Sequence, residues 1–224
     1  MGIAEHRAAA QSGPAIRVAV ISVSDTRTLE TDAGGALLQT LAGQAGLWVV
    51  GRELVPDDPE RIAACVLGYC GGAGRDADQN AEPGGADAGV PLAVARGANV
   101  ILVTGGTGVA PRDVTVDAIA PLFDRRLDGF GELFRMLSFA EIGPAAMLSR
   151  ACAGTVAGGA VFLIPGSPAA IRLAWERLIL PELGHLVSEL RRDPAPPDAG
   201  ASPPHHRHDH HGSDPEADHH SRRG

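Results

Sequence analysis

The stretch VILVTGGTGVAPRDVTVDAIAPLF, residues 100–123, joins an apolar run to a glycine-rich turn and then to an amphipathic segment. The apolar run has the composition of a strand that is buried on both faces of a parallel sheet. Three glycines in the turn TGGTG, residues 104–108, allow the backbone to approach a ligand closely. Because a glycine-rich turn between a strand and a helix suits a phosphate, the stretch predicts an α/β protein with a phosphate site.

Apolar periodicity predicts that strands and helices alternate along the rest of the chain. The expected strands are 17–24, 47–55, 99–104 and two shorter ones on either side of a Gly-Gly turn within 155–168. The expected helices are 32–46, 59–70, 90–98, 128–143 and 168–190, with Asp32 and Ser167 as caps. This alternation predicts an α/β fold, a three-layer sandwich over a mostly parallel sheet.

Three segments lack the periodicity of a packed domain. Residues 1–15 predict a loose N-terminal arm, and residues 71–89 predict a flexible Gly/Asp-rich insertion. Residues 193–224 are rich in Pro, Ala, Asp and His and predict a disordered tail. The ordered α/β domain is therefore expected to span residues 16–192.

Composition narrows the classes of partner and of chemistry. A net charge of −8 argues against nucleic acid, and the lack of an 18-residue apolar run or signal pattern predicts a cytoplasmic protein without membrane contact. Three widely spaced cysteines predict free thiols. All 19 basic residues are arginine, so a phosphate-loop lysine and a Schiff-base lysine are both excluded.

Small polar residues follow three of the predicted strands, in SVSDT (22–26), TGGTG (104–108) and PGSP (165–168). Since the carboxyl ends of parallel strands meet at one edge, a ligand is expected in the crevice there. Backbone amides, hydroxyls, helix N-termini and arginine would replace the missing lysine. The alternative is that each glycine only makes its turn.

Acidic side chains gather at the same turns, namely Asp25, Asp32, Asp57, Asp58 and Asp113. A carboxylate repels a polyphosphate unless a cation lies between them, which predicts Mg²⁺ held by one or two carboxylates and phosphate oxygens. The alternative is that these aspartates cap helices and open turns. The pattern favours capping for Asp25, Asp32 and Asp58 and leaves both interpretations open for Asp113.

The motifs GGTGVAPRDVTVDAI, DGFGELFRMLSF, LSR and PGSP together resemble the MoaB/MogA family of molybdenum cofactor biosynthesis proteins, from residue 17 to residue 186. The resemblance implies a molybdopterin-binding α/β fold. For active members it implies a molybdopterin adenylyltransferase, which uses ATP and Mg²⁺ to attach AMP to the terminal phosphate of molybdopterin and releases pyrophosphate. It also implies a homotrimer or hexamer, with other molybdenum cofactor enzymes as partners.

The resemblance extends to single residues. Asp57 in VPDD and Asp113 in RDVT match the two essential aspartates, which implies that they are catalytic and hold Mg²⁺. The other matching positions, expected to bind substrate, are Ser24, Asp25, Gly105, Gly106, Thr107, Gly108, Arg112, Thr115, Glu132, Arg135, Ser138, Ser149, Pro165, Gly166, Ser167 and Pro168.

Two branches of the family meet in this sequence. PLFDRRLDGFGELFRMLSFAEIG looks like the MoaB branch, some members of which lack activity, whereas RDVTVDA resembles the active MogA branch. Since both aspartates are present, we expect a working enzyme, with a catalytically idle molybdopterin carrier as the alternative. The His-rich segment 205–220 has two interpretations: the tail has a metal-binding role, or it is a solvating tail whose affinity for metal ions is adventitious.

The stretch GFGELFRMLSF, residues 129–139, brings the large apolar residues Phe130, Phe134, Leu137 and Phe139 together within a short segment. They are expected to form a subunit contact, or equally to be buried within one subunit.

Overall fold

The computed structural model describes residues 15–70 and 97–191, which form one α/β unit. The predictions for the N-terminal arm, the 71–89 insertion, most of the 90–98 helix and the His-rich tail lie outside the described residues. The strands are β1 (Arg17–Val23), β2 (Trp48–Val55), β3 (Val100–Thr104), β4 (Arg125–Arg126), β5 (Cys152–Val156) and β6 (Gly159–Ile164). The α-helices are α2 (Ala33–Gln44), α3 (Pro59–Cys70), α4 (Thr115–Ile119), α5 (Asp128–Ile142), α6 (Pro168–Ala174) and α7 (Leu180–Leu190).

The strands form one sheet in the order β2-β1-β3-β6-β5-β4, in which β2, β1, β3 and β6 run parallel. β5 and β4 are added in antiparallel orientation at one end, so the predicted mostly parallel sheet is confirmed. The expected Gly-Gly turn between β5 and β6 is one residue displaced, because Gly159 already pairs with Val156. Ala157 and Gly158 make this turn, with φ of 47° and 81°.

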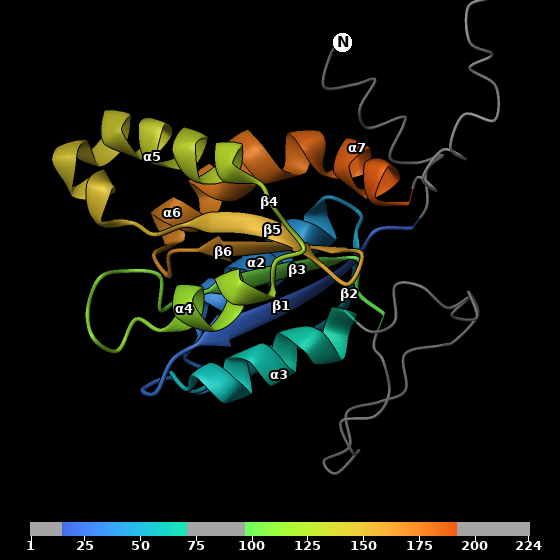
Figure 1. Ribbon diagram of the computed structural model, residues 1–224, viewed down its shortest axis with the longest axis horizontal. Helices are drawn as coiled ribbons and strands as arrows, with labels where there is room; N and C mark the ends of the chain where they lie inside the picture. Colours follow the sequence, from blue (N-terminus) through green and yellow to red (C-terminus); the bar gives the residue numbers. More distant parts are fainter. Residues whose placement is uncertain (1–14, 71–96, 192–224) are drawn as a thin grey trace, which may run out of the picture. The chain divides into compact units, whose positions relative to one another are not determined.

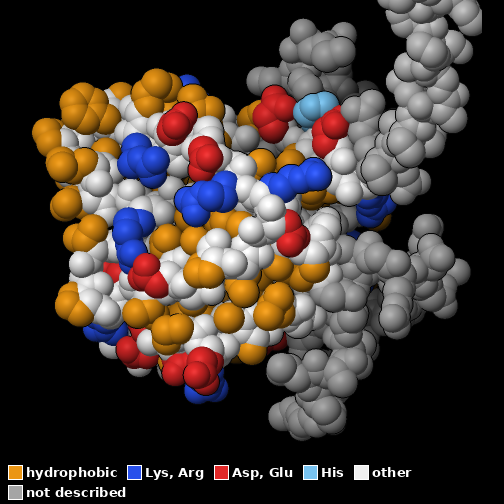
Figure 2. Space-filling model, in the orientation of Figure 1, with side chains coloured by type: hydrophobic (Ala, Val, Ile, Leu, Met, Phe, Trp, Pro, Cys, Tyr) orange, Lys and Arg blue, Asp and Glu red, His pale blue; other side chains and the backbone are white. Residues whose placement is uncertain are grey.

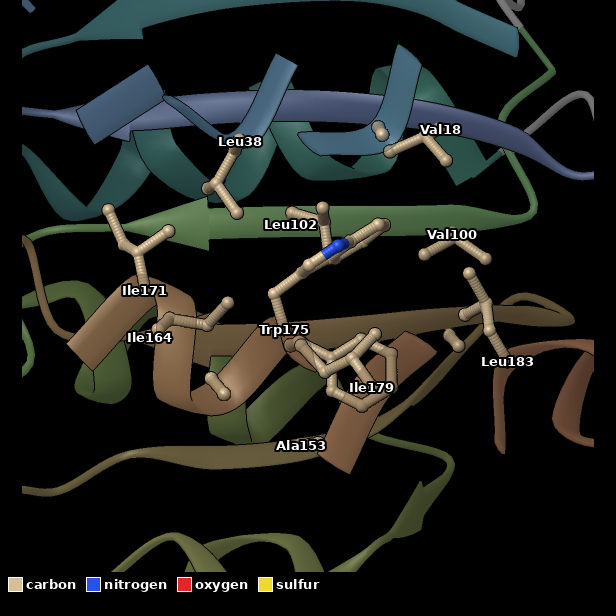
Figure 3. Close-up of a cluster of buried hydrophobic side chains, with 14 of the residues drawn as sticks. Val18, Leu38, Val100, Leu102, Ala153, Ile164, Ile171, Trp175, Ile179 and Leu183 are labelled. Carbon is tan, nitrogen blue, oxygen red and sulfur yellow. The ribbon is translucent and has the colours of Figure 1, made fainter. Parts of the chain in front are cut away.

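Helices cover both faces of the sheet, which confirms the three-layer sandwich (Figure 1). Along β1, Val18 and Val20 pack towards α2 and the C-terminal helices, whereas Ala19 and Ile21 pack towards α3 and α4. Strands with apolar side chains on both faces are what a doubly covered parallel sheet requires. Figure 3 shows the first of these two cores, where the fully buried Trp175 lies beside side chains from the sheet.

The predicted helix at 168–190 is continuous in extent but changes its winding. A π-helical segment, Trp175–Ile179, separates α6 from α7. Pro181 stands two residues after this segment and accounts for the wider turn, because it cannot donate a backbone hydrogen bond and its ring crowds the carbonyl four residues earlier. Within the part of the chain that is described, no helix has the length and apolar character to cross a membrane.

The α5 helix divides the phenylalanine-rich stretch between the two alternatives, since Phe130 and Phe134 are buried and Phe139 is exposed. Phe130 and Phe134 are buried in the subunit, where Phe130 packs edge-on against Phe162 with ring centroids 5.2 Å apart. Another set of apolar side chains is exposed on α5 and the following 3₁₀ helix η2 (Gly143–Leu148), namely Leu133, Met136, Phe139, Ile142, Met147 and Leu148. We call this set the α5 apolar surface. Figure 2 shows hydrophobic side chains gathered at the left edge, where α5 and η2 lie.

None of the three cysteines, all of which lie in the described residues, is in a disulfide, as the sequence predicts. Burial raises the pKa of Cys70 to about 12, with a smaller contribution from the nearby carboxylate of Asp124. Burial also raises the pKa of Cys152, although three neighbouring arginines act in the opposite direction. Neither thiol is therefore activated as a nucleophile at neutral pH.

Candidate functional site

The turns that follow the four parallel strands meet at one edge of the sheet. The amide of Ser24, after β1, donates to Val55 O at the end of β2, with a distance of 2.9 Å. The amide of Gly105, after β3, donates to Ile164 O at the end of β6, with a distance of 3.1 Å. The crevice that the sequence predicts at this edge is thus bordered by all three polar turns and, in addition, by the PDD turn after β2.

The glycine-rich turn needs its first two glycines for conformation and for space. Gly105 and Gly106 have φ of 101° and 61°, in the region that side chains disfavour. A Cβ on Gly105 would lie 2.4 Å from Val23 O. Thr115 holds the turn in place through two hydrogen bonds: its Oγ1 donates to Gly105 O at 2.8 Å, and its amide donates to Gly106 O at 3.1 Å. Thr115 is fully buried, so it supports the turn and does not line the crevice.

Asp57 and Asp113 both line a cavity of about 250 Å³ at this edge. They flank the glycine-rich turn from opposite ends. A Cβ on Gly106 would lie 3.3 Å from Asp57 Oδ1, and a Cβ on Gly108 would lie 2.6 Å from Asp113 Oδ2. The cavity is lined by Val23, Ser24, Thr26, Arg27, Asp57, Gly105, Gly106, Arg112, Asp113 and Gly166. The two aspartates that the resemblance singles out, 56 positions apart in the chain, therefore face the same space.

Asp57 is bound to Asp25 by two reciprocal hydrogen bonds. The Asp25 amide donates to Asp57 Oδ2 at 3.1 Å, and the Asp57 amide donates to Asp25 Oδ1 at 2.9 Å. Arg112 Nη2 lies 3.3 Å from Asp25 Oδ2 and 3.6 Å from Asp57 Oδ2. The guanidinium thus offsets the repulsion between the two carboxylates, although its own 58% exposure keeps each ion pair weak.

Asp113 does not cap the helix that follows it. Its Oδ2 accepts from the Ala110 amide at 2.8 Å, and no side chain caps α4. Helix capping is therefore wrong for Asp113, whereas a role in a turn is confirmed, because its side chain and its amide both bond Ala110. Helix capping is confirmed for Asp58, whose Oδ1 accepts from the Arg61 amide at 2.8 Å in the first turn of α3.

Asp32 is likewise a cap and does not line the cavity, although its Oδ1 lies 3.9 Å from Nη1 of Arg27, which does. Its Oδ1 accepts from the Gly35 amide at 3.0 Å, and its Oδ2 accepts from Ser22 Oγ at 2.6 Å and from Arg52 Nη2 at 3.0 Å. Burial alone would raise the pKa of Asp32, but these hydrogen bonds and the Arg52 charge together hold that pKa below its usual value. Arg52 also donates to Leu29 O, so the pair ties the loop after β1 to β2.

A second cavity of about 170 Å³ adjoins the first. Its lining residues are Gly106, Thr107, Gly108, Asp113, Ser149, Pro165 and Gly166. Gly106, Asp113 and Gly166 line both cavities. Asp113 therefore stands at the boundary between two adjoining spaces, one lined by charged side chains and the other by small ones.

Other predicted site residues lie outside both cavities. Ser167 caps α6, where its Oγ accepts from the Ala170 amide at 3.3 Å, and Pro168 is the first residue of that helix. Glu132, Arg135 and Ser138 lie on α5, and Arg135 donates to Ala151 O at 3.1 Å. The structure does not bring these five residues to the cavities, so their binding role stays a prediction from the resemblance.

Sequence reasoning missed three residues at this edge. Thr26 and Arg27 line the first cavity directly after the predicted Ser-Asp pair; Thr26 belongs to the predicted polar turn 22–26 but was not assigned a role, and Arg27 has no sequence signal beyond its position. Arg150 binds the glycine-rich loop from outside, with Nε donating to Gly108 O at 2.7 Å. The motif LSR contains it, but no periodicity or spacing distinguishes it from a surface arginine.

The donor set suits a cation that is shared with phosphates. Within residues 15–70 and 97–191, no three His, Cys, Asp or Glu side chains come together as a metal centre. Asp57 and Asp113 each use Oδ2 for protein contacts, and no hydrogen bond to Oδ1 of either is found in these two ranges. Two free carboxylate oxygens beside backbone amides match Mg²⁺, which usually takes one or two carboxylates together with phosphate oxygens and water.

Several known proteins are similar to this chain in sequence and in fold. Residues 86–185 match the family model described as "Probable molybdopterin binding domain". A Bacillus cereus protein named molybdenum cofactor biosynthesis protein B is 44% identical over 193 residues, which cover 86% of this chain and 99% of that protein. The crystal structure of a molybdenum cofactor biosynthesis protein B superposes with a TM-score of 0.67 at 43% identity, covering 82% of this chain and 100% of the other. The tungsten cofactor synthesizing protein MoaB from Pyrococcus furiosus gives a TM-score of 0.64 at 30% identity, covering 81% and 100%.

Proposed function

The chain belongs to the molybdenum cofactor biosynthesis protein B (MoaB) family, and from this premise we propose that it is a molybdopterin adenylyltransferase. The proposed reaction transfers AMP from ATP to the terminal phosphate of molybdopterin and releases pyrophosphate. One observation supports it above the others. Two carboxylates from different strand ends, Asp57 and Asp113, face one polar cavity across a glycine-rich turn.

In this reaction an oxygen of the molybdopterin phosphate attacks the α-phosphorus of ATP. A bond forms between that oxygen and the α-phosphorus, and the bond from the α-phosphorus to the oxygen that bridges it to the β-phosphorus breaks. Pyrophosphate leaves with the bonding electron pair. Since two anions must approach each other, catalysis depends mainly on positioning and on neutralisation of charge.

Asp57 and Asp113 would hold Mg²⁺ through their free Oδ1 atoms. Mg²⁺ bound there supplies positive charge to the reacting phosphates, which the carboxylates alone would repel. Arg27 and Arg112 line the same cavity and supply further positive charge, in place of the lysine that the chain lacks. Ser24 and Thr26 add hydroxyl donors at the same wall.

The two adjoining cavities suit two substrates whose phosphates meet at a shared wall. Asp113 and the glycines 106 and 166 form that wall. Glycine allows the closest approach of backbone amides to phosphate oxygens, and Asp113 would then lie beside the atoms that react. Ser149 and Pro165 line the far side of the second cavity.

The test is an assay of the wild-type protein with ATP, Mg²⁺ and molybdopterin. We expect stoichiometric release of pyrophosphate and an adenylated product of the corresponding mass. Binding of molybdopterin with no product would support the idle carrier of the same family instead. A mixture without Mg²⁺ is the matched control and should give neither product.

We also propose that the protein is a homotrimer or a hexamer and that the α5 apolar surface forms a contact between subunits. Six large apolar side chains lie exposed on two consecutive helical segments, and a contiguous surface of this kind is typical of a protein interface. Phe139 is 60% exposed and Met147 is 77% exposed, so neither can be assigned to the core of one subunit.

A further inference from the structure

Arg150 makes three hydrogen bonds to the backbone of residues 107–113, the segment that runs from the end of the glycine-rich turn to Asp113. Its backbone amide donates to Thr107 O at 2.9 Å, and its Nε donates to Gly108 O at 2.7 Å. Its Nη2 donates to the backbone carbonyl of Asp113. Its Nη1 lies 2.9 and 3.0 Å from the two carboxylate oxygens of Asp117 in α4. One residue therefore joins the start of the loop, its end and the helix that follows.

These contacts occupy each nitrogen of the guanidinium group. Arg150 is also absent from the lining of both cavities, whereas its neighbour Ser149 lines the second one. Arg150 thus binds protein oxygens through each guanidinium nitrogen while it lines neither cavity, which is the arrangement of a support for the loop.

From this geometry we infer that Arg150 is a positioning residue, which fixes the 107–113 loop so that the Asp113 carboxylate faces the cavity. The inference rests on the proposed function, because it assigns to Arg150 the placement of a group proposed to be catalytic. The loop needs such support. Gly108 has no side chain to restrict the backbone, and within residues 15–70 and 97–191 the Asp113 carboxylate accepts a single hydrogen bond, from the Ala110 amide.

The fork shape of the guanidinium is essential to this role. Three acceptors in three directions, Gly108 O, Asp113 O and the Asp117 carboxylate, match a planar group with fixed donor directions. A lysine ammonium keeps the charge but cannot reach the three acceptors in this geometry. Arg150→Lys therefore tests whether the planar guanidinium geometry, and not the positive charge alone, is required.

The experiment compares the wild type with Arg150→Ala, Arg150→Lys and the control Arg126→Ala in adenylyl-transfer kinetics. Arg126 is also an arginine in an ion pair, with Asp128 at 3.2 Å, and it lines neither cavity. We expect kcat to fall about 100-fold in Arg150→Ala and on the order of 10-fold or more in Arg150→Lys, since a misplacement of about 1 Å has effects of this size. KM for ATP should stay within about threefold, because no binding contact is removed. Arg126→Ala should equal the wild type.

Two further measurements distinguish positioning from a general loss of stability. Guanidinium ion added at millimolar concentration should restore part of kcat in Arg150→Ala and none in Arg150→Lys, where the ammonium occupies the site. Hydrogen exchange should accelerate at the amides of Ala110, Asp113 and Thr115, which the loop holds, and should be unchanged in β3.

A wild-type kcat in Arg150→Ala, or full activity in Arg150→Lys, would overturn the inference. A change in KM alone would also overturn it, since Arg150 would then be a substrate ligand. If Arg150→Ala does not fold, Arg150→Lys decides. If the wild type itself shows no transfer, the proposed function fails, and exchange at the three loop amides still tests whether Arg150 holds the loop.

Discussion

Gly108→Ala should separate activity from stability at this site. A Cβ at position 108 would lie 2.6 Å from Asp113 Oδ2, whereas an ordinary contact begins at 3.4 Å. The carboxylate must therefore move by about 0.8 Å. Gly108 does not have a positive φ, so alanine fits the backbone and the flexible carboxylate yields. A displacement of this size in a catalytic group predicts a fall in kcat of about 100-fold, or about 2.7 kcal/mol in activation free energy.

The free energy of unfolding should hardly change in the same variant. The displaced carboxylate loses its hydrogen bond from the Ala110 amide, which costs about 1 kcal/mol. Alanine regains about 0.4–1 kcal/mol by restricting the unfolded chain. Gly184→Ala in α7 is the control, because nothing lies within 4 Å of a Cβ there. It should add about 1 kcal/mol of stability and leave activity unchanged.

Adenylyl-transfer kinetics and urea unfolding on both variants provide the assay. Full activity in Gly108→Ala would refute the reasoning, since the position of the Asp113 carboxylate would then be irrelevant to transfer. Loss of activity together with several kcal/mol of stability would also refute it, because the effect would then lie in the fold.

Two further predictions concern the Asp32 cap and the α5 apolar surface. Asp32→Asn should cost about 3 kcal/mol at pH 7, since it removes the partner of the largely buried Arg52. The fold lowers the pKa of Asp32, so the stabilisation by its carboxylate is present above the unfolded pKa of about 3.9 and is lost as the pH falls through the pKa of the folded state. The difference in free energy of unfolding between wild type and variant, measured by urea unfolding, should therefore stay constant above about pH 5 and become smaller below about pH 4. Phe139→Glu should lower the mass measured by light scattering from that of a trimer or hexamer, whereas Leu67→Glu, at an exposed apolar position on α3 across the sheet, should not. A wild-type protein that is monomeric at micromolar concentration would contradict the proposed subunit contact.

Side-chain patterns predicted the elements whose signal is local. Asp32 and Ser167 cap the helices that the sequence assigns to them, because a cap bonds an amide three residues ahead. The buried strands were predicted from continuous apolar runs. β4 was not predicted, since two residues are too short for any periodicity.

The orientation of α5 could have been predicted in more detail. Phe130 and Phe134 are four residues apart and so lie on one face of a helix, whereas Met136 and Phe139 are three residues apart and fall on another. The prediction for residues 129–139 treated all the large apolar side chains as one group and so did not distinguish the two faces of the helix. Helical spacing applied to the same stretch separates the buried pair from the exposed one.

The sequence predicts that the turns after the parallel strands meet at one edge of the sheet, but it does not predict the contacts between their residues. Parallel strands bring Asp57 and Asp113 to one edge by topology alone. The role of Arg150 could not be predicted, because its acceptors include backbone carbonyls of Thr107, Gly108 and Asp113, which lie 37–43 positions earlier. Their directions depend on the path of the loop, which no side-chain pattern records.

The most direct test of the central claim is adenylyl transfer by Asp113→Asn, with ATP, Mg²⁺ and molybdopterin. Asn retains an oxygen for the Ala110 amide but removes the charge that a cation requires, so the melting temperature should stay close to that of the wild type. Transfer should fall by about 10³-fold, and likewise in Asp57→Asn. Asp58→Asn, in which Asn caps α3 about as well as Asp, should stay near the wild-type rate. Full activity in Asp113→Asn would contradict the claim.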